Sequence, residues 1–303
     1  MPFARGFLPL ILSLLTLGAL PGAAFAAKKK AAAASGSVYR GAIIMDAATG
    51  KVLFEDNADV SNPPASVTKL MTFLVVHDKL QSGALTLQTA VTVTAEDSRM
   101  GGTQVWLKEK EVFTVQELLY ALMIQSANDA ASALAHAAAG SAPAFVELMN
   151  ARARDLGMLR TTFRSPHGLP PPSRRLADGD LTTPRDLALL SRYLLLNTDI
   201  LNYTSVRTRR FGEGQRPADR VVTMTNHNHL LNRVSGVDGL KTGFTNGAGF
   251  CLAATAERNG HRIIAVTMGS AERKARDIKM AELIERGFAL LPADSPAFAR
   301  APE

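Results

Sequence analysis

Residues 63–72 read Pro63-Pro64-Ala65-Ser66-Val67-Thr68-Lys69-Leu70-Met71-Thr72, and the rest of the chain can be understood from this stretch. Two prolines interrupt the preceding segment, and an apolar run without Pro or Gly then continues from Val67 to Leu80. Because proline is tolerated at a first helical turn and the apolar residues recur at helical spacing, the pattern predicts a helix start. Ser66 and Lys69 would share one face of that helix, where the amine can reach the hydroxyl.

This pair has a chemical interpretation. A serine hydroxyl is a poor nucleophile until a neighbouring base takes its proton, and a lysine in a dry site can be that base. The free N–H groups at a helix start can also stabilise a developing oxyanion. The spacing alone is weak evidence, because a chain of 303 residues should contain roughly one such Ser–Lys pair by chance.

The composition is that of a soluble globular protein with one large domain or two small ones, since 47% of its residues are hydrophobic and 20% are charged. The formal net charge is +7. However, there are only four Tyr and one Trp, and no basic run is interleaved with aromatic residues. We therefore expect no nucleic-acid partner. A mildly basic surface suits an anionic cell envelope or acidic substrates.

The N-terminal sequence predicts export. Arg5 precedes an apolar run from Phe7 to Leu20, and the run leads to a small-residue A-x-A end at Ala26. This order is typical of a secretory signal peptide, here residues 1–26, cleaved after Ala26. Residues 27–36, rich in Lys and Ala, are expected to form a flexible leader. The mature protein would be soluble in the periplasm or cell envelope, with no transmembrane segment.

Hydrophobic patterns along the chain predict strands at both ends and helices in the middle. Strands are expected in 40–54 (two, around a turn at 46–50), 89–95, 221–225, 239–242, 250–257 and 262–268. Helices are expected in 67–80, 115–124, 129–139, 144–156, 184–196 and 275–291, and a long loop in 165–180. This order predicts an α+β fold in which one sheet is shared by the two ends of the chain and the middle forms a mostly helical lobe.

Two further short motifs lie on these elements. Ser126-Ala127-Asn128 falls between two predicted helices, where by itself it reads as a polar turn that caps the second helix. Lys241-Thr242-Gly243 ends a strand-like run, and Gly243 would allow a substrate backbone to approach the strand edge. By itself this motif could be an ordinary strand end.

The three motifs together carry a resemblance. S-x-x-K at a helix start, S-x-N between helices and K-T-G on a strand, in this order, resemble the low-molecular-mass penicillin-binding proteins, which are serine D-alanyl-D-alanine carboxypeptidases. The wider stretches 65–72 and 238–245 and the sequence Ser165-Pro166-His167-Gly168-Leu169 strengthen the match. The resemblance covers residues 37–291 and leaves 292–303 as a C-terminal tail. It implies a β-lactamase/transpeptidase-like fold with an antiparallel sheet.

The resemblance also implies catalytic roles. Ser66 would attack the carbonyl between the two terminal D-alanines of a peptidoglycan stem peptide, which forms an acyl-enzyme and releases D-alanine. Lys69 would be the base for acylation, and Ser126 would relay the proton towards the leaving amine. Water would then hydrolyse the acyl-enzyme. β-Lactams mimic the D-alanyl-D-alanine terminus and would acylate the same serine as covalent inhibitors.

Binding roles follow from the same resemblance. Lys241 and Thr242 would bind the terminal carboxylate of the substrate. Asn128 would either hydrogen-bond the substrate backbone or orient the lysine base. The backbone N–H groups of Ser66 and Phe244 would form the oxyanion hole. No metal or organic cofactor is expected.

Three other activities remain open. Carboxypeptidases of this family often carry a second, β-rich domain and an amphipathic C-terminal helix, and this chain, which ends at Glu303, shows neither, so a DD-endopeptidase that hydrolyses D-alanyl cross-links is the main alternative. A β-lactamase is disfavoured, because the loop 165–180 contains Asp178 and Asp180 but no glutamate to activate water. A non-catalytic wall-binding protein is disfavoured because every motif side chain is present.

The remaining cysteine and histidines are expected to be structural. Cys251 is the only cysteine, so it cannot form an intrachain disulfide, and its apolar surroundings predict a buried packing residue. His167 is expected to be structural or solvated. His227 and His229 have no carboxylate or cysteine at ligand spacing, so we expect surface or packing positions and no metal.

Overall fold

The computed structural model of the protein describes residues 38–300. The predicted signal peptide (1–26), the predicted leader (27–36) and the last three residues of the predicted tail lie outside the described residues. None of the helices in the described part is long and apolar enough to cross a membrane.

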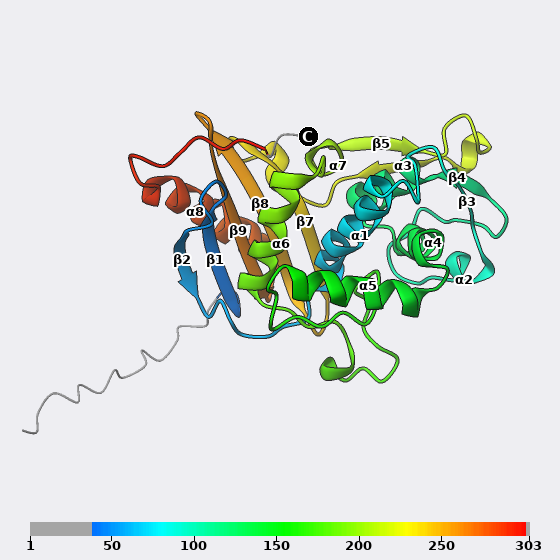
Figure 1. The fold of residues 1–303 in the computed structure, drawn as a ribbon, viewed down its shortest axis with the longest axis horizontal. Coiled ribbons are helices and arrows are strands. Elements are labelled where there is room, and N and C mark those ends of the chain that lie inside the picture. Colours follow the sequence, from blue (N-terminus) through cyan, green and yellow to red (C-terminus); the bar gives the residue numbers. More distant parts are fainter. Residues whose placement is uncertain (1–37, 301–303) are drawn as a thin grey trace, which may run out of the picture. The chain divides into compact units, whose positions relative to one another are not determined.

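A five-stranded antiparallel sheet joins the two ends of this region (Figure 1). Its order is β2-β1-β9-β8-β7, and strand β1 pairs with β9 from Gly41 opposite Met268 to Asp46 opposite Ile263. The predicted sheet built from both ends of the chain is therefore confirmed. The strands are β1 (Gly41–Asp46), β2 (Val52–Asp56), β7 (Val237–Thr245), β8 (Gly249–Arg258) and β9 (His261–Ser270).

Alternate residues of the sheet face two different cores, as the period of two in a strand requires. Ile44 and Ala265 pack in a cluster with residues of α8 (Arg273–Leu290). Their neighbours Ile43 and Val266 join the larger core with the remaining helices. Figure 1 shows the result as layers, with α8 on one side of the sheet and α6 (Pro184–Asn197) on the other.

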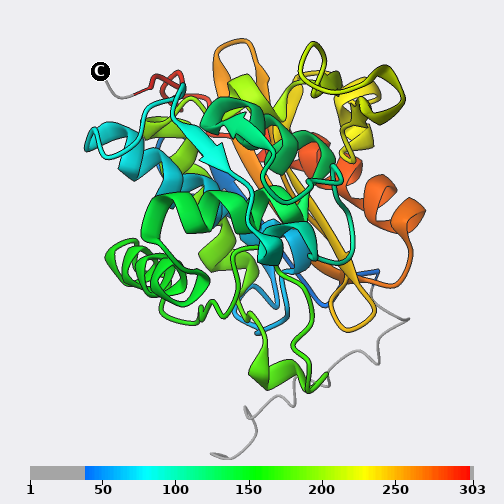
Figure 2. The ribbon, with the colours of Figure 1, turned by 90° about the vertical axis from the view of Figure 1, so that its right-hand side faces the viewer.

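The middle of the chain forms a helical lobe beyond α6. Helix α1 (Lys69–Gln81), buried from Lys69 to Val76, runs through it and contacts α4 (Asn128–Ala139), α5 (Ala142–Asp155) and α6. Figure 2 looks onto this lobe, with the helices in cyan and green in front of the strands in orange. The predicted helices are confirmed, with shifts of one or two residues at most ends. The predicted helix 115–124 divides into α3 (Val115–Tyr120) and a π-helical turn (Ala121–Gln125).

Several short elements were predicted only in part. They are α2 (Ala95–Ser98), α7 (Leu201–Thr204), and the strand pairs β3 (Ala90–Thr92) with β4 (Val112–Thr114) and β5 (Thr208–Phe211) with β6 (Val222–Thr225). Only β3 and β6 were foreseen, and β3 is shorter than predicted. Strands of three or four residues give too few alternations to be recognised.

The start of helix α6, which lies close to the candidate site, is determined by local sequence. Thr183 is its N-cap, and the hydroxyl accepts a hydrogen bond from Asp186 N at 3.1 Å. Pro184 occupies the first turn, where its missing N–H is not needed. The helix therefore begins as predicted, directly after the loop 165–180 that borders the candidate site.

Candidate active site

Ser66 lies in a 3-10 turn, Ala65–Thr68, that leads directly into α1. The helical segment thus begins as a 3-10 turn two residues before the predicted start at Val67, and the α-helix itself begins two residues after it. Ala65 has a positive φ of 49°, a conformation that costs energy for a residue other than glycine. This sharp entry places Ser66 at the surface of a hollow rather than inside the helix packing.

Strand β7 passes directly beside the backbone of Ser66. A Cβ atom placed on Gly243 would lie 2.6 Å from Pro64 O and 2.9 Å from Ser66 N, so only glycine fits without movement. This contact brings the K-T-G and S-x-x-K motifs together. The backbone that approaches Gly243 is the protein's own, and the approach of a substrate backbone to this strand edge stays a prediction.

The amine of Lys69 is held by three oxygen atoms. Lys69 Nζ lies 3.0 Å from Ser66 Oγ, 2.7 Å from Asn128 Oδ1 and 2.7 Å from the backbone oxygen of His167. Two of these partners are carbonyl oxygens, which only accept hydrogen bonds. A neutral amine that donates its two hydrogens to them therefore keeps its lone pair for the hydroxyl of Ser66.

The surroundings of Lys69 favour this neutral form. The side chain is fully buried. Burial lowers the pKa of the Lys69 amine well below its usual range, and the positive charge of Lys241 lowers it further. The carboxylates of Asp180 and Asp129 act in the opposite direction with smaller effects. A buried amine with a depressed pKa, in contact with a serine hydroxyl, has the properties of a general base.

The loop 165–180 holds the third oxygen in place through Asp180. The buried Asp180 carboxylate accepts hydrogen bonds from Thr68 Oγ1 at 2.8 Å, Arg164 N at 2.6 Å and Ser165 N at 3.0 Å. These bonds tie the base of the loop to the turn that carries Ser66. His167 takes part through its backbone oxygen, and its ring nitrogen Nδ1 accepts from Leu169 N at 3.1 Å. The ring of His167 thus has a local contact within the loop, which agrees with the expectation that it is structural or solvated.

The S-x-N motif reaches the same site from the start of α4. Ser126 ends the π-helical turn with a positive φ of 65° and lines the hollow, while the buried Asn128 reaches Lys69 behind it. Both polar atoms of the Asn128 amide have a partner: Oδ1 accepts from Lys69 Nζ, and Nδ2 donates one hydrogen to Gly101 O at 2.8 Å. Of the two roles predicted for Asn128, the structure favours orientation of the lysine.

The carboxylate of Asp129 anchors the loop that contains Val105 and Leu107, which faces the S-x-N motif. Its buried carboxylate accepts hydrogen bonds from Val105 N at 3.2 Å and Leu107 N at 3.0 Å. Asn128 N in turn donates to Thr103 O at 2.8 Å. The loop around Thr103 therefore forms one wall of the hollow, a contribution that the sequence did not reveal.

The hollow in front of Ser66 has a volume of about 240 Å³. Ser66, Ser126, Thr242, Gly243 and Phe244 all line it, so five of the predicted site residues meet in one place. Lys69, Asn128 and Lys241 support it from behind, as buried side chains. Across the described residues, the hydroxyl of Ser126 makes no hydrogen bond with either lysine.

Four positively charged or ionisable groups border the same hollow and were missed by the sequence reasoning. They are His227, His229, Arg273 and Arg276. His227 is exposed and His229 is partly exposed, in agreement with the expected surface positions, and both also border the hollow. Desolvation of the ring and the neighbouring cations lower the pKa of His227 to about 4, so its ring is neutral at neutral pH. No group of three or more potential metal ligands occurs within residues 38–300.

Lys241 does not itself line the hollow. Its amine donates to the backbone oxygen of Thr242 at 3.0 Å, and burial together with the charge of Arg276 lowers its pKa to about 7. Two arginines, Arg273 and Arg276, line the hollow, and the guanidinium of Arg276 is buried and paired with Asp277 Oδ1 at 2.6 Å. A carboxylate ligand would therefore meet Arg276 and the Thr242 hydroxyl, with Lys241 behind them.

Aromatic rings form the outer rim. Phe244 is half exposed and stacks on Phe250 with 4.1 Å between ring centroids. The guanidinium of Arg273 lies over the Phe250 ring at 5.8 Å. Cys251, next to Phe250, is buried with its pKa raised to about 11, so it is the predicted packing residue.

Fold and site together define the class. The protein has the β-lactamase/transpeptidase-like fold, and a serine in contact with a buried lysine stands at the start of the central helix. The chain also matches the model of the D-alanyl-D-alanine carboxypeptidase family, peptidase S11, over residues 26–272. It belongs to this family of low-molecular-mass penicillin-binding proteins.

Individual relatives agree with this assignment. The chain is 36% identical over 280 residues to the D-alanyl-D-alanine carboxypeptidase DacC of Escherichia coli, an alignment that covers 90% of this chain and 66% of that protein. It is 33% identical over 249 residues to DacF of Bacillus subtilis, with coverage of 82% and 62%. The chain thus spans somewhat less than two thirds of the length of these curated relatives.

Solved structures are similar over more of their own length. Penicillin-binding protein D2 of Listeria monocytogenes, in an ampicillin-bound form, has a TM-score of 0.72 and 31% identity, with 83% of this chain and 97% of that chain covered. The carboxypeptidase DacD of Francisella tularensis has a TM-score of 0.77 and 28% identity, with coverage of 86% and 74%.

Proposed function

We propose that this protein is a serine-type D-alanyl-D-alanine carboxypeptidase that removes the terminal D-alanine from peptidoglycan stem pentapeptides through an acyl-enzyme on Ser66. The observation that carries the proposal is the 3.0 Å contact between Ser66 Oγ and the buried amine of Lys69. The family membership and the names of the relatives support the substrate class.

Acylation follows from the geometry. The neutral Lys69 amine takes the proton of Ser66 while Asn128 Oδ1 and His167 O hold its two hydrogens. The hydroxyl oxygen then attacks the carbonyl of the penultimate D-alanine. The resulting oxyanion is stabilised by the backbone N–H groups of Ser66 and Phe244, which the contact of Gly243 with the Ser66 backbone brings near each other.

The leaving D-alanine occupies the cationic hollow. Arg276 and Thr242 bind its carboxylate. The charge of Lys241 behind them adds to the positive electrostatic potential at this carboxylate. The hydroxyl of Ser126 lines the hollow together with Ser66, so it can pass the proton from Lys69 to the departing amine. Water then hydrolyses the acyl-enzyme and restores Ser66.

β-Lactams acylate the same serine and are released slowly. The loop 165–180 offers only two carboxylates, and both are occupied. Asp178 is paired with Arg175 at 2.9 Å, and Asp180 is held by Thr68 and backbone N–H groups. Neither is free to activate water, so we propose β-lactam inhibition rather than β-lactamase activity.

The test is the mass of the protein after incubation with benzylpenicillin. We expect an increase by the mass of one penicillin, located on the peptide that contains Ser66, and no adduct on Ser66→Ala. A Ser66→Cys variant, which keeps a nucleophile in place, controls for misfolding. An adduct that persists on Ser66→Ala would refute the assignment of the nucleophile.

We further propose that residues 37–291 act as the peptidase domain and that the protein is exported to the periplasm or cell envelope after cleavage behind Ala26. The basic, apolar and small-residue order of residues 1–26 supports export. Intact-mass analysis of the protein from an envelope fraction should show Ala27 as its first residue. A full-length chain in the cytoplasm would contradict this proposal.

A further inference from the structure

A second hollow follows the first along strand β7. The first hollow is lined by residues 242–244 of the chain, and the second, of about 420 Å³, by residues 245–247. The second hollow also includes Pro64 and Ala65, the residues directly before Ser66. The two hollows therefore adjoin each other at the nucleophile.

The loop 165–180 forms the other wall of this second hollow. Leu176 covers the turn after β7 so closely that a Cβ on Gly247 would lie 2.7 Å from its side chain. The apolar part of the wall comes from Leu169, Pro170, Pro171 and Leu176. A hydrocarbon chain can pack against this surface.

Arg174 is the cation of this hollow. It makes no ion pair within the part of the chain that the structure describes, in contrast to its neighbour Arg175, which pairs with Asp178. The one carboxylate in the lining, Asp180, is buried and already accepts from Thr68 and Arg164 N. The hollow thus combines an apolar wall with one cation that is free to bind an anion.

The position of this hollow relates it to one part of the substrate. Strand β7 is an edge strand, so an extended peptide can lie along it. With the terminal carboxylate in the first hollow and the scissile carbonyl at Ser66, the acyl part of the peptide continues towards residues 245–247. Because an extended chain rises about 3.4 Å per residue, the third residue of the stem peptide lies within about 7 Å of the scissile carbonyl.

We propose that the second hollow binds the side chain of the third stem residue, and that Arg174 selects a diamino acid with a carboxylate at the end of this side chain. This inference rests on the proposed function. Diaminopimelate and lysine have the same aliphatic chain and the same terminal amine, and they differ in a carboxylate on the last carbon. Arg174 can bind that carboxylate, while the prolines and leucines pack against the chain that both residues share.

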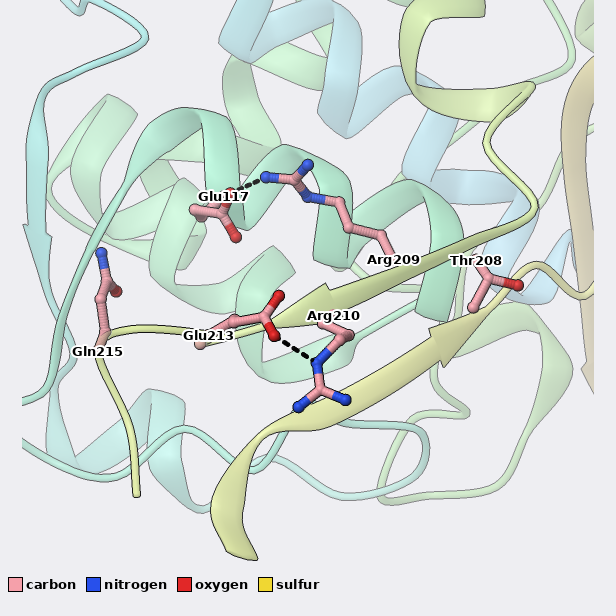
Figure 3. A pocket seen from close by; sticks show the side chains of 7 residues that line it. Glu117, Thr208, Arg209, Arg210, Glu213 and Gln215 are labelled. Carbon is pink, nitrogen blue, oxygen red and sulfur yellow. Dashed lines mark hydrogen bonds and ion pairs between the residues drawn. The ribbon is translucent and has the colours of Figure 1, made fainter. Parts of the chain in front are cut away.

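Another hollow, of about 560 Å³, differs from the second hollow in that its cations are paired (Figure 3). It lies at β5 and the turn after it, away from the motif residues. Its two arginines are already neutralised, because Arg209 pairs with Glu117 and Arg210 Nε pairs with Glu213 at 2.8 Å. It therefore offers no free cation to a ligand.

The test compares two synthetic pentapeptides that end in D-alanyl-D-alanine and differ only at the third residue, meso-diaminopimelate in one and L-lysine in the other. D-Alanine release gives kcat/KM for each peptide. Because Arg174 is exposed, we expect a preference of about fivefold for diaminopimelate. Arg174→Gln should reduce it to less than about twofold, and Arg174→Glu should reverse it in favour of lysine.

Arg175→Gln is the matched control, because it removes a cation from the next position of the same loop and should leave the preference unchanged. Equal kcat/KM values for the two peptides in the wild-type protein would overturn the inference while the proposed function stands. A preference that survives Arg174→Gln and Arg174→Glu would also overturn it. Failure to release D-alanine from either peptide would defeat the proposed function itself.

Discussion

Asn128→Asp is the substitution that most directly examines the role of the neutral lysine. Asp has the shape of Asn and keeps an oxygen near Lys69 Nζ, but it adds a negative charge at about the 2.7 Å distance of the present hydrogen bond. A charge of this sign stabilises the protonated amine. The change should therefore protonate the base, and it also removes the hydrogen bond that Asn128 Nδ2 donates to Gly101 O.

The size of the effect can be estimated from that distance. Two unit charges 2.7 Å apart attract each other by about 6 kcal/mol at the effective dielectric constant suited to protein sites. We assign about half of this to the cost of burying the new carboxylate, which leaves about 3 kcal/mol in favour of the protonated lysine. This corresponds to a loss of about 100-fold in acylation rate at neutral pH.

Stopped-flow acylation by a fluorescent penicillin, measured from acidic to alkaline pH, provides the assay. The rate for Asn128→Asp should be about 100-fold lower at pH 7 and should rise about tenfold per pH unit above it, because the lysine must lose its proton first. Asn197→Asp, which adds the same charge at an exposed site on α6, should behave like the wild type. A rate within about threefold of wild type with an unchanged pH profile would refute the role of Lys69 as the base.

Three further predictions concern stability. Gly243→Ala would place a Cβ atom 2.6 Å from Pro64 O, so urea unfolding should show a loss of about 1–3 kcal/mol, accompanied by slower acylation. Thr183→Ala removes the N-cap of α6 and should cost about 1 kcal/mol in the same assay, whereas a loss near zero would contradict the cap. The pKa of Lys241 is about 7 in the folded protein and near 10.5 when unfolded. The unfolded chain then binds more protons between these values, so stability should rise with pH by up to about 1.4 kcal/mol per unit, and Lys241→Met should remove this contribution.

The sequence was informative where a short spacing determines the geometry. Ser66 and Lys69 are three residues apart, and any helical turn places both side chains on one face. The strand character of residues 239–242 similarly predicted that the K-T-G motif lies on a strand of the sheet. The order of strands and helices was enough for the α+β class, because strands at both ends of a chain can join one sheet.

The rest of the site depends on tertiary contacts that no local pattern records. Arg276 reaches the hollow because α8 packs beside β8 and β9, and the arginine looks like any surface residue in the sequence. His227 lies in a turn that folds back beside β7. The positive φ of Ser126, a residue that lines the hollow, is imposed by the packing around the π-helical turn rather than by a glycine. The residues that complete the site therefore could not be identified from local sequence patterns.

The paired arrangement of two lysines is a further consequence of the fold. Lys69 and Lys241 are far apart in the sequence, yet each is fully buried, and the charge of Lys241 lowers the pKa of Lys69. Removing it with Lys241→Met should raise the pKa of Lys69 and shift the acidic limb of the acylation profile to higher pH. This shift would separate an electrostatic role of Lys241 from simple carboxylate binding, which would change the KM of a peptide substrate instead.

The central claim is that Ser66 and Lys69 hydrolyse the terminal D-alanyl-D-alanine bond, and its most direct test uses two defined muropeptides, a monomeric pentapeptide and a D-alanyl cross-linked dimer. Each is incubated with residues 27–303 and with the Ser66→Ala variant, and the products are followed by mass spectrometry. We predict that the monomer loses the mass of one alanine residue with the wild type alone, while the dimer stays intact. Cleavage of the dimer with an unchanged monomer would contradict the account and identify an endopeptidase, and D-alanine release by Ser66→Ala would contradict the assigned nucleophile.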